Sequence, residues 1–134
     1  MLLEKTISDV KESFPEAILD VSEFAGERSV HIKCDRILDI LSFFKEAGFE
    51  FLADLTAVDN LTLGGFERFV VVYHLLSHES VERVTVKAYL PEEKPTLRSV
   101  ESLWKTADWQ EREVYDLYGI TFESHPNMTR ILNP

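Results

Sequence analysis

The sequence is poor in cysteine, with Cys34 as its single thiol among 134 residues. One cysteine excludes an internal disulfide, and a cluster that needs four thiolate ligands cannot be held by this chain alone. Long hydrophobic runs are also missing: the longest, Phe69 to Leu76, is far shorter than the roughly 20 residues that cross a bilayer. The acidic N-terminus lacks the charged and apolar regions of a signal peptide. We therefore expect a reducing compartment, and contact with any membrane only through a partner.

Basic residues are scarce relative to acidic ones. Lysine and arginine number 14 against 24 aspartates and glutamates, which gives a formal net charge of −10. This charge repels phosphate backbones and anionic lipid surfaces, so direct binding to nucleic acid or membrane is disfavoured. Hydrophobic residues (45%) and charged residues (28%) stand in the proportion of a folded globular chain. Without internal repeats or linkers, residues 1–134 are predicted to form a single domain.

Apolar residues at helical spacing alternate along the chain with extended runs that end at turn residues. The pattern predicts helices over residues 2–14, 36–47, 96–106 and 109–118, and strands over 17–24, 28–33, 49–59, 68–77 and 81–90. Asp35 and Asp108 are expected to cap the helices that follow them, and Gly48 and Gly119 to end the helices that precede them. The first two strands should form an antiparallel hairpin. This order predicts an α+β fold, a two-layer sandwich in which helices cover a mixed β-sheet.

The last predicted helix is strongly acidic. It holds one base and four acids, namely Arg112, Asp108, Glu111, Glu113 and Asp116. Asp116 lies in the last turn, where a negative charge opposes the helix dipole. Arg112 is four residues earlier and can pair with Asp116, but an exposed pair of this kind contributes only about 0.3 to 0.5 kcal/mol. The surplus of negative charge therefore indicates a cation outside the helix.

A helical wheel separates two faces of this helix. Val114, Leu117 and Tyr118 fall on the arc that is expected to meet the core. The opposite arc holds Trp109, Arg112, Glu113 and Asp116, with Glu111 and Tyr115 at the margins. A tryptophan is unusual on a face that meets only water, so this arc is predicted to be a docking surface.

The residues after Gly119 are predicted to be extended. His125 precedes Pro126, which disfavours a helical backbone at the histidine. This tail and the acidic helix are expected to bind a partner together, although Arg130 could instead fold back onto the acids of its own helix. We accordingly divide the domain into a globular part, residues 1–118, and an extended partner-binding tail, residues 119–134.

One segment, ADWQEREVYDLYGITFESHPNMTRIL, resembles the signature of an NADH dehydrogenase family, that of the thirty-kilodalton subunit of respiratory complex I. The shared pattern falls on Glu111, Arg112, Glu113, Asp116, Leu117, Gly119, Ile120, Phe122, His125, Pro126, Arg130, Ile131 and Leu132. Upstream, DLTAVD at 54–59, VVYHLLS at 71–77 and SVESLWKTADW at 99–109 resemble the strands and the pre-signature helix of that family. The resemblance thus covers nearly the whole chain and agrees with the predicted α+β fold.

The resemblance implies a non-catalytic accessory and assembly subunit of the peripheral arm of an NADH:quinone oxidoreductase. Such a subunit supports electron transfer from NADH to quinone coupled to proton translocation, at the cytoplasmic face of the cell membrane. It would dock onto the large quinone-site subunit and other peripheral-arm subunits, and it would bind no cofactor itself, since FMN and the iron–sulfur clusters lie on partner subunits. The implied partner interface comprises Trp109, Glu111, Arg112, Glu113, Asp116, His125, Pro126 and Arg130.

Two alternatives remain at the level of the sequence. The chain could be the equivalent subunit of a membrane-bound hydrogenase or formate hydrogenlyase-type complex, because those complexes share the signature. A stand-alone acid/base hydrolase is disfavoured, since Glu111 and Glu113 diverge on a helix and cannot flank one bond.

His74 and His78 lie in a predicted strand, roughly 13 Å apart, which is too far to chelate one ion. Cys34 is expected to be a small buried hydrophobe.

Overall fold

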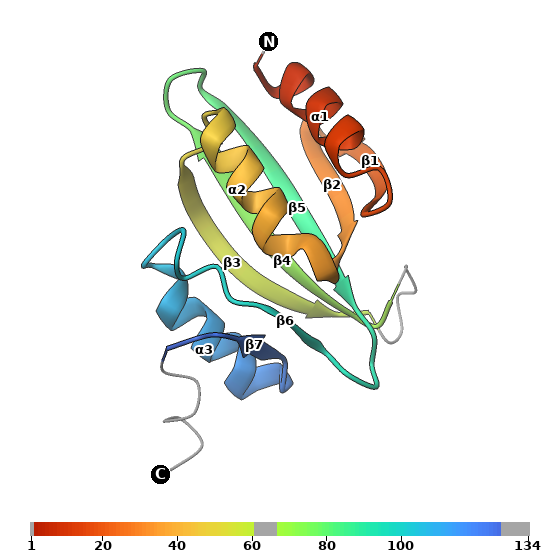
Figure 1. The fold of residues 1–134 in the computed structure, drawn as a ribbon, viewed down its shortest axis with the longest axis vertical. Helices are drawn as coiled ribbons and strands as arrows, with labels where there is room; N and C mark the ends of the chain where they lie inside the picture. Colours follow the sequence, from red (N-terminus) through yellow and green to blue (C-terminus); the bar gives the residue numbers. More distant parts are fainter. Residues whose placement is uncertain (1, 61–66, 127–134) are drawn as a thin grey trace.

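The computed structural model describes residues 2–60 and 67–126 (Figure 1). The helical elements are α1 (Leu2–Ser13), the short 3-10 helix η1 (Cys34–Arg36), α2 (Ile37–Ala47) and α3 (Ala107–Tyr118). The strands are β1 (Ile18–Phe24), β2 (Glu27–Lys33), β3 (Phe51–Asp59), β4 (Phe69–Ser77), β5 (Glu82–Leu90), β6 (Thr96–Arg98) and β7 (Thr121–Glu123).

The main sheet has five strands in the order β1-β2-β5-β4-β3. β1 and β2 form the predicted antiparallel hairpin, β2 runs parallel to β5, and the remaining pairs are antiparallel. The prediction of a mixed sheet is therefore confirmed. α1 and α2 lie side by side over one face of this sheet, whereas α3 lies beside its β3 edge (Figure 1).

The core fills the space between the two helices and the sheet. α1 contributes Leu3, Ile7 and Val10, which recur at helical spacing on one face. α2 contributes Ile37, Ile40, Leu41 and Phe44 in the same way. The sheet supplies alternate residues of its strands, such as Val84, Val86 and Ala88 of β5. The two-layer α+β sandwich that the sequence predicts is confirmed.

The prediction of a helix over residues 96–106 is wrong. Thr96–Arg98 forms β6, which pairs in parallel with β7, and turns fill residues 101–103 and 105–106. The backbone N–H of Ser99 continues this contact by donating to the carbonyl oxygen of Glu123 at 2.8 Å. The following turn is held by Trp104, whose Nε1 donates to the carbonyl oxygen of Glu50 at 2.8 Å. A small second sheet thus joins two segments that are distant in sequence.

The predicted glycines at the C-terminal ends of the helices are confirmed, whereas the predicted N-terminal capping residues are wrong. Gly48 and Gly119 follow α2 and α3 with φ of 121° and 73°, a region that favours glycine. Asp35 lies inside η1, and Asp108 lies in the first turn of α3 rather than before it. The N-cap residues are Arg36 for α2 and Thr106 for α3, and neither makes a side-chain cap hydrogen bond.

The packed part of the chain continues beyond the predicted boundary at Tyr118. Ile120 and Phe122 are buried and belong to the same hydrophobic core as the sheet and helices. The extended backbone that the sequence predicts after Gly119 includes β7, which pairs with β6. Residues 119–126 are therefore part of the folded body.

Candidate docking surface on helix α3

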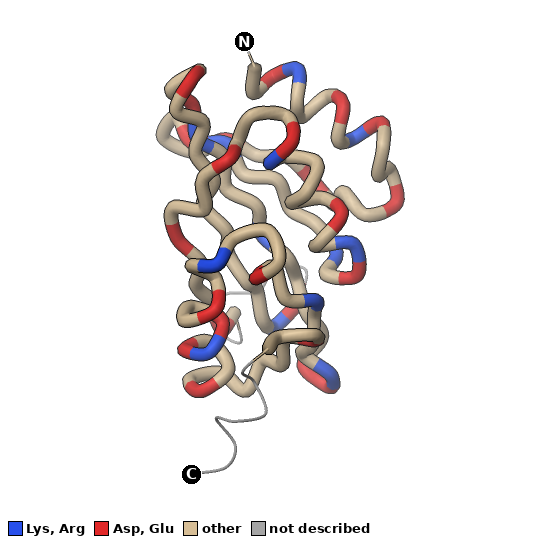
Figure 2. The backbone as a smooth tube through the Cα atoms, turned by 60° about the vertical axis from the view of Figure 1, so that its left-hand side comes forward, with Lys and Arg blue, Asp and Glu red and all other residues tan. Residues whose placement is uncertain are grey.

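Helix α3 exposes two large apolar side chains. Trp109 is 61% exposed and Leu117 is 77% exposed, although the wheel predicted that Leu117 meets the core. Both flank a hollow of about 290 Å³ whose lining also includes Arg112, Glu113 and Asp116. Figure 2 shows several acidic positions along this helix. We call the surface formed by Trp109, Arg112, Glu113, Asp116 and Leu117 the α3 face.

Arg112 is engaged with an aromatic ring rather than with an acid. Its guanidinium carbon lies 5.4 Å from the ring centroid of Trp109, a cation–π arrangement. Its Nε atom is buried and has no hydrogen-bond partner. The predicted pair with Asp116 does not form, although both residues lie in the described part of the chain. The acids of the α3 face are therefore not neutralised by the arginine of their own helix.

Glu111 lies inside the molecule, and the prediction that it occupies the margin of the exposed face is wrong. Its side chain is fully buried. Ser99 Oγ donates to Oε1 at 2.6 Å, and the backbone N–H of Val100 donates to Oε2 at 2.9 Å. Burial raises the pKa of this carboxyl to about 7, against the two hydrogen bonds, which lower it. Glu111 thus ties α3 to the segment after β6.

His125 is also buried, and it connects the segment after β7 to the start of α3. Its Nε2 donates to the carbonyl oxygen of Asp108 at 3.0 Å. The same nitrogen lies 3.0 Å from Asp108 Oδ1 and 3.8 Å from Glu111 Oε1. The polar side chains on and beside α3 are therefore divided, with Glu111 and His125 facing inward and Glu113 and Asp116 facing outward.

The structure places seven of the eight predicted interface residues in three groups. Trp109, Glu113, Asp116 and Pro126 are exposed, Arg112 is half-buried, and Glu111 and His125 are buried. Arg130 lies outside the described residues, and so does its possible fold-back onto α3. The sequence prediction missed Leu117 as a surface residue and Ser99 as the partner of Glu111. No sequence signal pointed to Ser99, because its contact with Glu111 depends on the β6–β7 pairing.

The other candidates from the sequence have structural roles. His74 is half-buried, and its Nδ1 lies 3.1 Å from Thr85 Oγ1. Cys34 is half-buried, and burial followed by the nearby Asp35 charge raises the pKa of its thiol. Within residues 2–60 and 67–126, no group of three or more His, Cys, Asp or Glu side chains is arranged to hold a metal ion.

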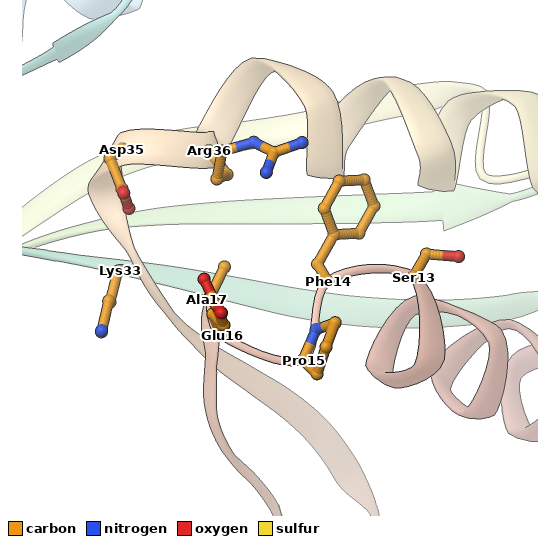
Figure 3. A pocket seen from close by; sticks show the side chains of 8 residues that line it. All are labelled: Ser13, Phe14, Pro15, Glu16, Ala17, Lys33, Asp35 and Arg36. Carbon is orange, nitrogen blue, oxygen red and sulfur yellow. The ribbon is translucent and has the colours of Figure 1, made fainter.

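A second hollow of about 290 Å³ lies between the turn after α1 and η1 (Figure 3). Figure 3 shows the Arg36 guanidinium beside the Phe14 ring, and its central carbon is 5.0 Å from the ring centroid. Arg36 Nε also donates to Asp39 at 2.9 Å. These contacts occupy the arginine, and the lining contains none of the predicted interface residues. The hollow is therefore separate from the α3 face.

Comparison with known proteins identifies relatives over most of the chain. A family described as "Respiratory-chain NADH dehydrogenase, 30 Kd subunit" matches residues 30–134. An NADH-quinone oxidoreductase subunit of Citrifermentans bemidjiense is 44% identical over 129 residues, covering 96% of this chain and 79% of that protein. An NADH-quinone oxidoreductase subunit of Moorella thermoacetica is 38% identical over 133 residues, covering 98% of this chain and 86% of that protein.

Solved structures are also similar to most of this chain. A trypsin-resistant fragment of Nqo5 superposes with a TM-score of 0.84 at 36% identity, covering 94% of this chain and 98% of that chain. A chain of the membrane-bound sulfane sulfur reductase, an archaeal respiratory membrane complex, superposes with a TM-score of 0.77 at 27% identity, covering 93% of this chain and 72% of that chain. Among the described residues, no helix has the length and apolar character needed to cross a membrane.

Proposed function

The chain belongs to the family of the 30 kDa subunit of the respiratory-chain NADH dehydrogenase, and from that premise we propose that it is an accessory and assembly subunit of the peripheral arm of an NADH:quinone oxidoreductase. In this role it performs no catalysis alone and binds neither FMN nor an iron–sulfur cluster. It docks onto the large quinone-site subunit at the cytoplasmic face of the membrane. There it supports electron transfer from NADH to quinone coupled to proton translocation.

The observation that carries this proposal is the pair of exposed apolar side chains on an acidic helix. Trp109 and Leu117 flank a hollow bordered by Glu113 and Asp116. Tryptophan is enriched among the residues that dominate binding energy at protein interfaces. A rim of uncompensated acids adds selectivity for a basic partner surface and speeds association. The α3 face therefore has the composition of an interface with an apolar centre and a charged rim.

The buried network supports the same role by fixing the orientation of α3. Glu111 binds the segment after β6, and His125 binds the first turn of the helix. On the outer side, Gln110 Nε2 donates to Asp54 of β3 at 3.0 Å. With its backbone fixed at several points, α3 presents Trp109 and Leu117 at a small conformational cost on binding.

Charge reversal on the α3 face tests this proposal. The double variant Glu113→Lys and Asp116→Lys should leave the isolated chain folded, because both side chains are exposed. It should lose copurification with the large quinone-site subunit, since two attractive contacts become repulsive. A matched control, Glu12→Lys with Glu16→Lys, changes the net charge equally at exposed positions on and after α1 and should copurify normally. Unchanged copurification of the α3 variant would refute the interface.

A second candidate is the equivalent subunit of another respiratory membrane complex, of the membrane-bound hydrogenase or formate hydrogenlyase type. The similarity to a chain of the sulfane sulfur reductase complex favours it. Affinity purification of the complex from native membranes separates the two candidates. An NADH-oxidising flavoprotein among the copurified subunits supports the first, and a nickel-binding large subunit supports the second.

A further inference from the structure

Three large apolar side chains are exposed at the end of the main sheet that holds the β1–β2 and β4–β5 turns. Phe24 is 85% exposed, Val81 is 83% exposed and Phe51 is 47% exposed. Because β2 runs parallel to β5, the β1–β2 turn and the β4–β5 turn lie at the same end of the sheet. Phe51 pairs with Leu76 near that end of β4. In Figure 1 the β4–β5 turn is at the top, while α3 and β7 are at the bottom.

Two features of Val81 are energetically unfavourable in the isolated chain. It exposes an apolar side chain, and it holds a left-handed backbone with φ of 54°. A β-branched residue is an outlier in this region, where glycine or asparagine is usual. Such backbone strain is concentrated at functional sites in proteins. An exposed valine at this position is therefore unexpected unless its side chain has a contact outside the chain.

The neighbouring apolar groups also occupy defined positions. Phe24 is the last residue of β1, and it is followed by Ala25 and Gly26, which turn the chain with φ of 53° and 84°. Phe51 packs on His78, with ring centroids 4.2 Å apart. The His78 backbone N–H in turn donates to Glu50 Oε1 at 3.3 Å. Phe51 is on β3, at the opposite edge of the sheet from β1, so we call the surface formed by Phe24 and Val81 the tip surface.

The charges around the tip surface indicate the chemistry of its partner. Its exposed acids are Glu23, Glu27 and Glu79, and Arg83 is exposed beside them. This acidic surrounding disfavours an anionic lipid surface. It complements a polypeptide that carries lysine or arginine around an apolar pocket. We propose that the tip surface binds a second polypeptide of the assembled complex, distinct from the one on the α3 face, with Phe24 and Val81 in its apolar pocket.

Photo-crosslinking in the assembled complex tests this proposal, which rests on the proposed role as a subunit. Phe24→p-benzoylphenylalanine keeps an aromatic ring at the turn, and the same replacement at Trp109 reports on the α3 face. We expect position 24 to give an adduct with a polypeptide other than the one captured from position 109. An adduct with lipid, an adduct with the same polypeptide or no adduct at position 24 overturns the proposal. Position 109 tests the α3 face separately, so failure of either surface is recognised independently.

A substitution at Val81 provides a second measurement that does not depend on crosslinking. Val81→Asn relieves the left-handed backbone, so the isolated chain should unfold at a temperature several degrees higher. The same variant should enter the complex several-fold less efficiently in competition with the unaltered chain, because its apolar contact is lost. The adduct from position 109 should persist, because Trp109 is on α3, which lies beside the β3 edge and not at the β4–β5 turn. A more stable variant that assembles equally well would overturn the proposal.

Discussion

At the scale of single residues, Glu111 is the side chain with the most unusual chemistry. The fold removes its carboxyl from water, and this desolvation raises the pKa from 4.5 to about 7. Between these values the folded chain binds more protons than the unfolded chain. The free energy of unfolding should therefore be highest below pH 4.5 and fall as the pH rises through 7, by an amount on the order of 3 kcal/mol. Urea unfolding of the isolated chain between pH 4.5 and pH 8 measures this fall.

Two variants test whether the fall in unfolding free energy with pH arises from Glu111. Glu111→Gln keeps the shape of the side chain but cannot ionise, so its unfolding free energy should lack this fall with pH. Glu113→Gln, two residues away and exposed, should retain it. Equal pH dependence in the two variants would contradict the assignment of the titration to Glu111.

At the scale of elements, the end of α3 depends on a left-handed residue. Gly119 has φ of 73°, and its backbone N–H donates to the carbonyl oxygen of Tyr115 at 2.9 Å. A Cβ atom at this position would meet nothing within 4 Å, so the cost of a substitution is conformational rather than steric. Gly119→Ala should lower the unfolding free energy by about 1 kcal/mol.

Asparagine is the matched control at this position, because it tolerates the left-handed region better than alanine. Gly119→Asn should therefore lie between the glycine and alanine forms in a urea unfolding series. Both variants keep the buried Ile120 and Phe122 unchanged. An alanine variant as stable as the unaltered chain would show that this backbone conformation is not required.

Elements that depend on local pattern were predictable from the sequence, and elements that depend on distant contacts were not. α1, α2 and the strands of the main sheet follow from apolar periodicity, and Gly48 and Gly119 marked helix ends. β6 was mistaken for a helix because its pairing with β7 joins residues distant in sequence. The burial of Glu111 was also missed. Its hydrogen-bond donors, Ser99 and Val100, belong to the segment after β6, outside the helix whose periodicity was read. Trp109, Glu113 and Asp116 are exposed as the helical wheel predicted, whereas Leu117 and Glu111 are not where the wheel placed them. Contacts outside the helix decide which arc is buried.

At the scale of the whole molecule, two surfaces with exposed apolar residues lie at different borders of one sheet. The α3 face lies beside the β3 edge, and the tip surface lies at the end that holds the β1–β2 and β4–β5 turns. The α3 face carries Trp109 and Leu117, and the tip surface carries Phe24 and Val81. Both surfaces are surrounded by acids, and the chain has a formal net charge of −10. Under the two proposals, the domain holds two neighbours at a fixed distance from one another. Its overall charge favours a basic neighbour on each surface.

The charge of the whole chain predicts that its assembly depends on salt. Solvent-exposed charges interact over about 30 Å at 0.01 M ionic strength but over about 8 Å at 0.15 M. Affinity for a complex lacking this subunit should therefore fall as salt is raised, and Asp116→Asn should weaken binding several-fold at low salt but little at high salt. Equilibrium binding of the labelled chain at several salt concentrations measures both effects.

A change in the apolar part of the same surface separates charge from contact area. Trp109→Ala removes an exposed ring without changing the net charge, so it should weaken binding by a similar factor at every salt concentration. Glu12→Gln removes one exposed acid on α1 and should alter the salt dependence less than Asp116→Asn, because its charge lies far from the α3 face. If the two acid variants lose equal affinity, the attraction arises from net charge alone. A larger loss for Asp116→Asn instead locates the basic partner surface opposite the last turn of α3.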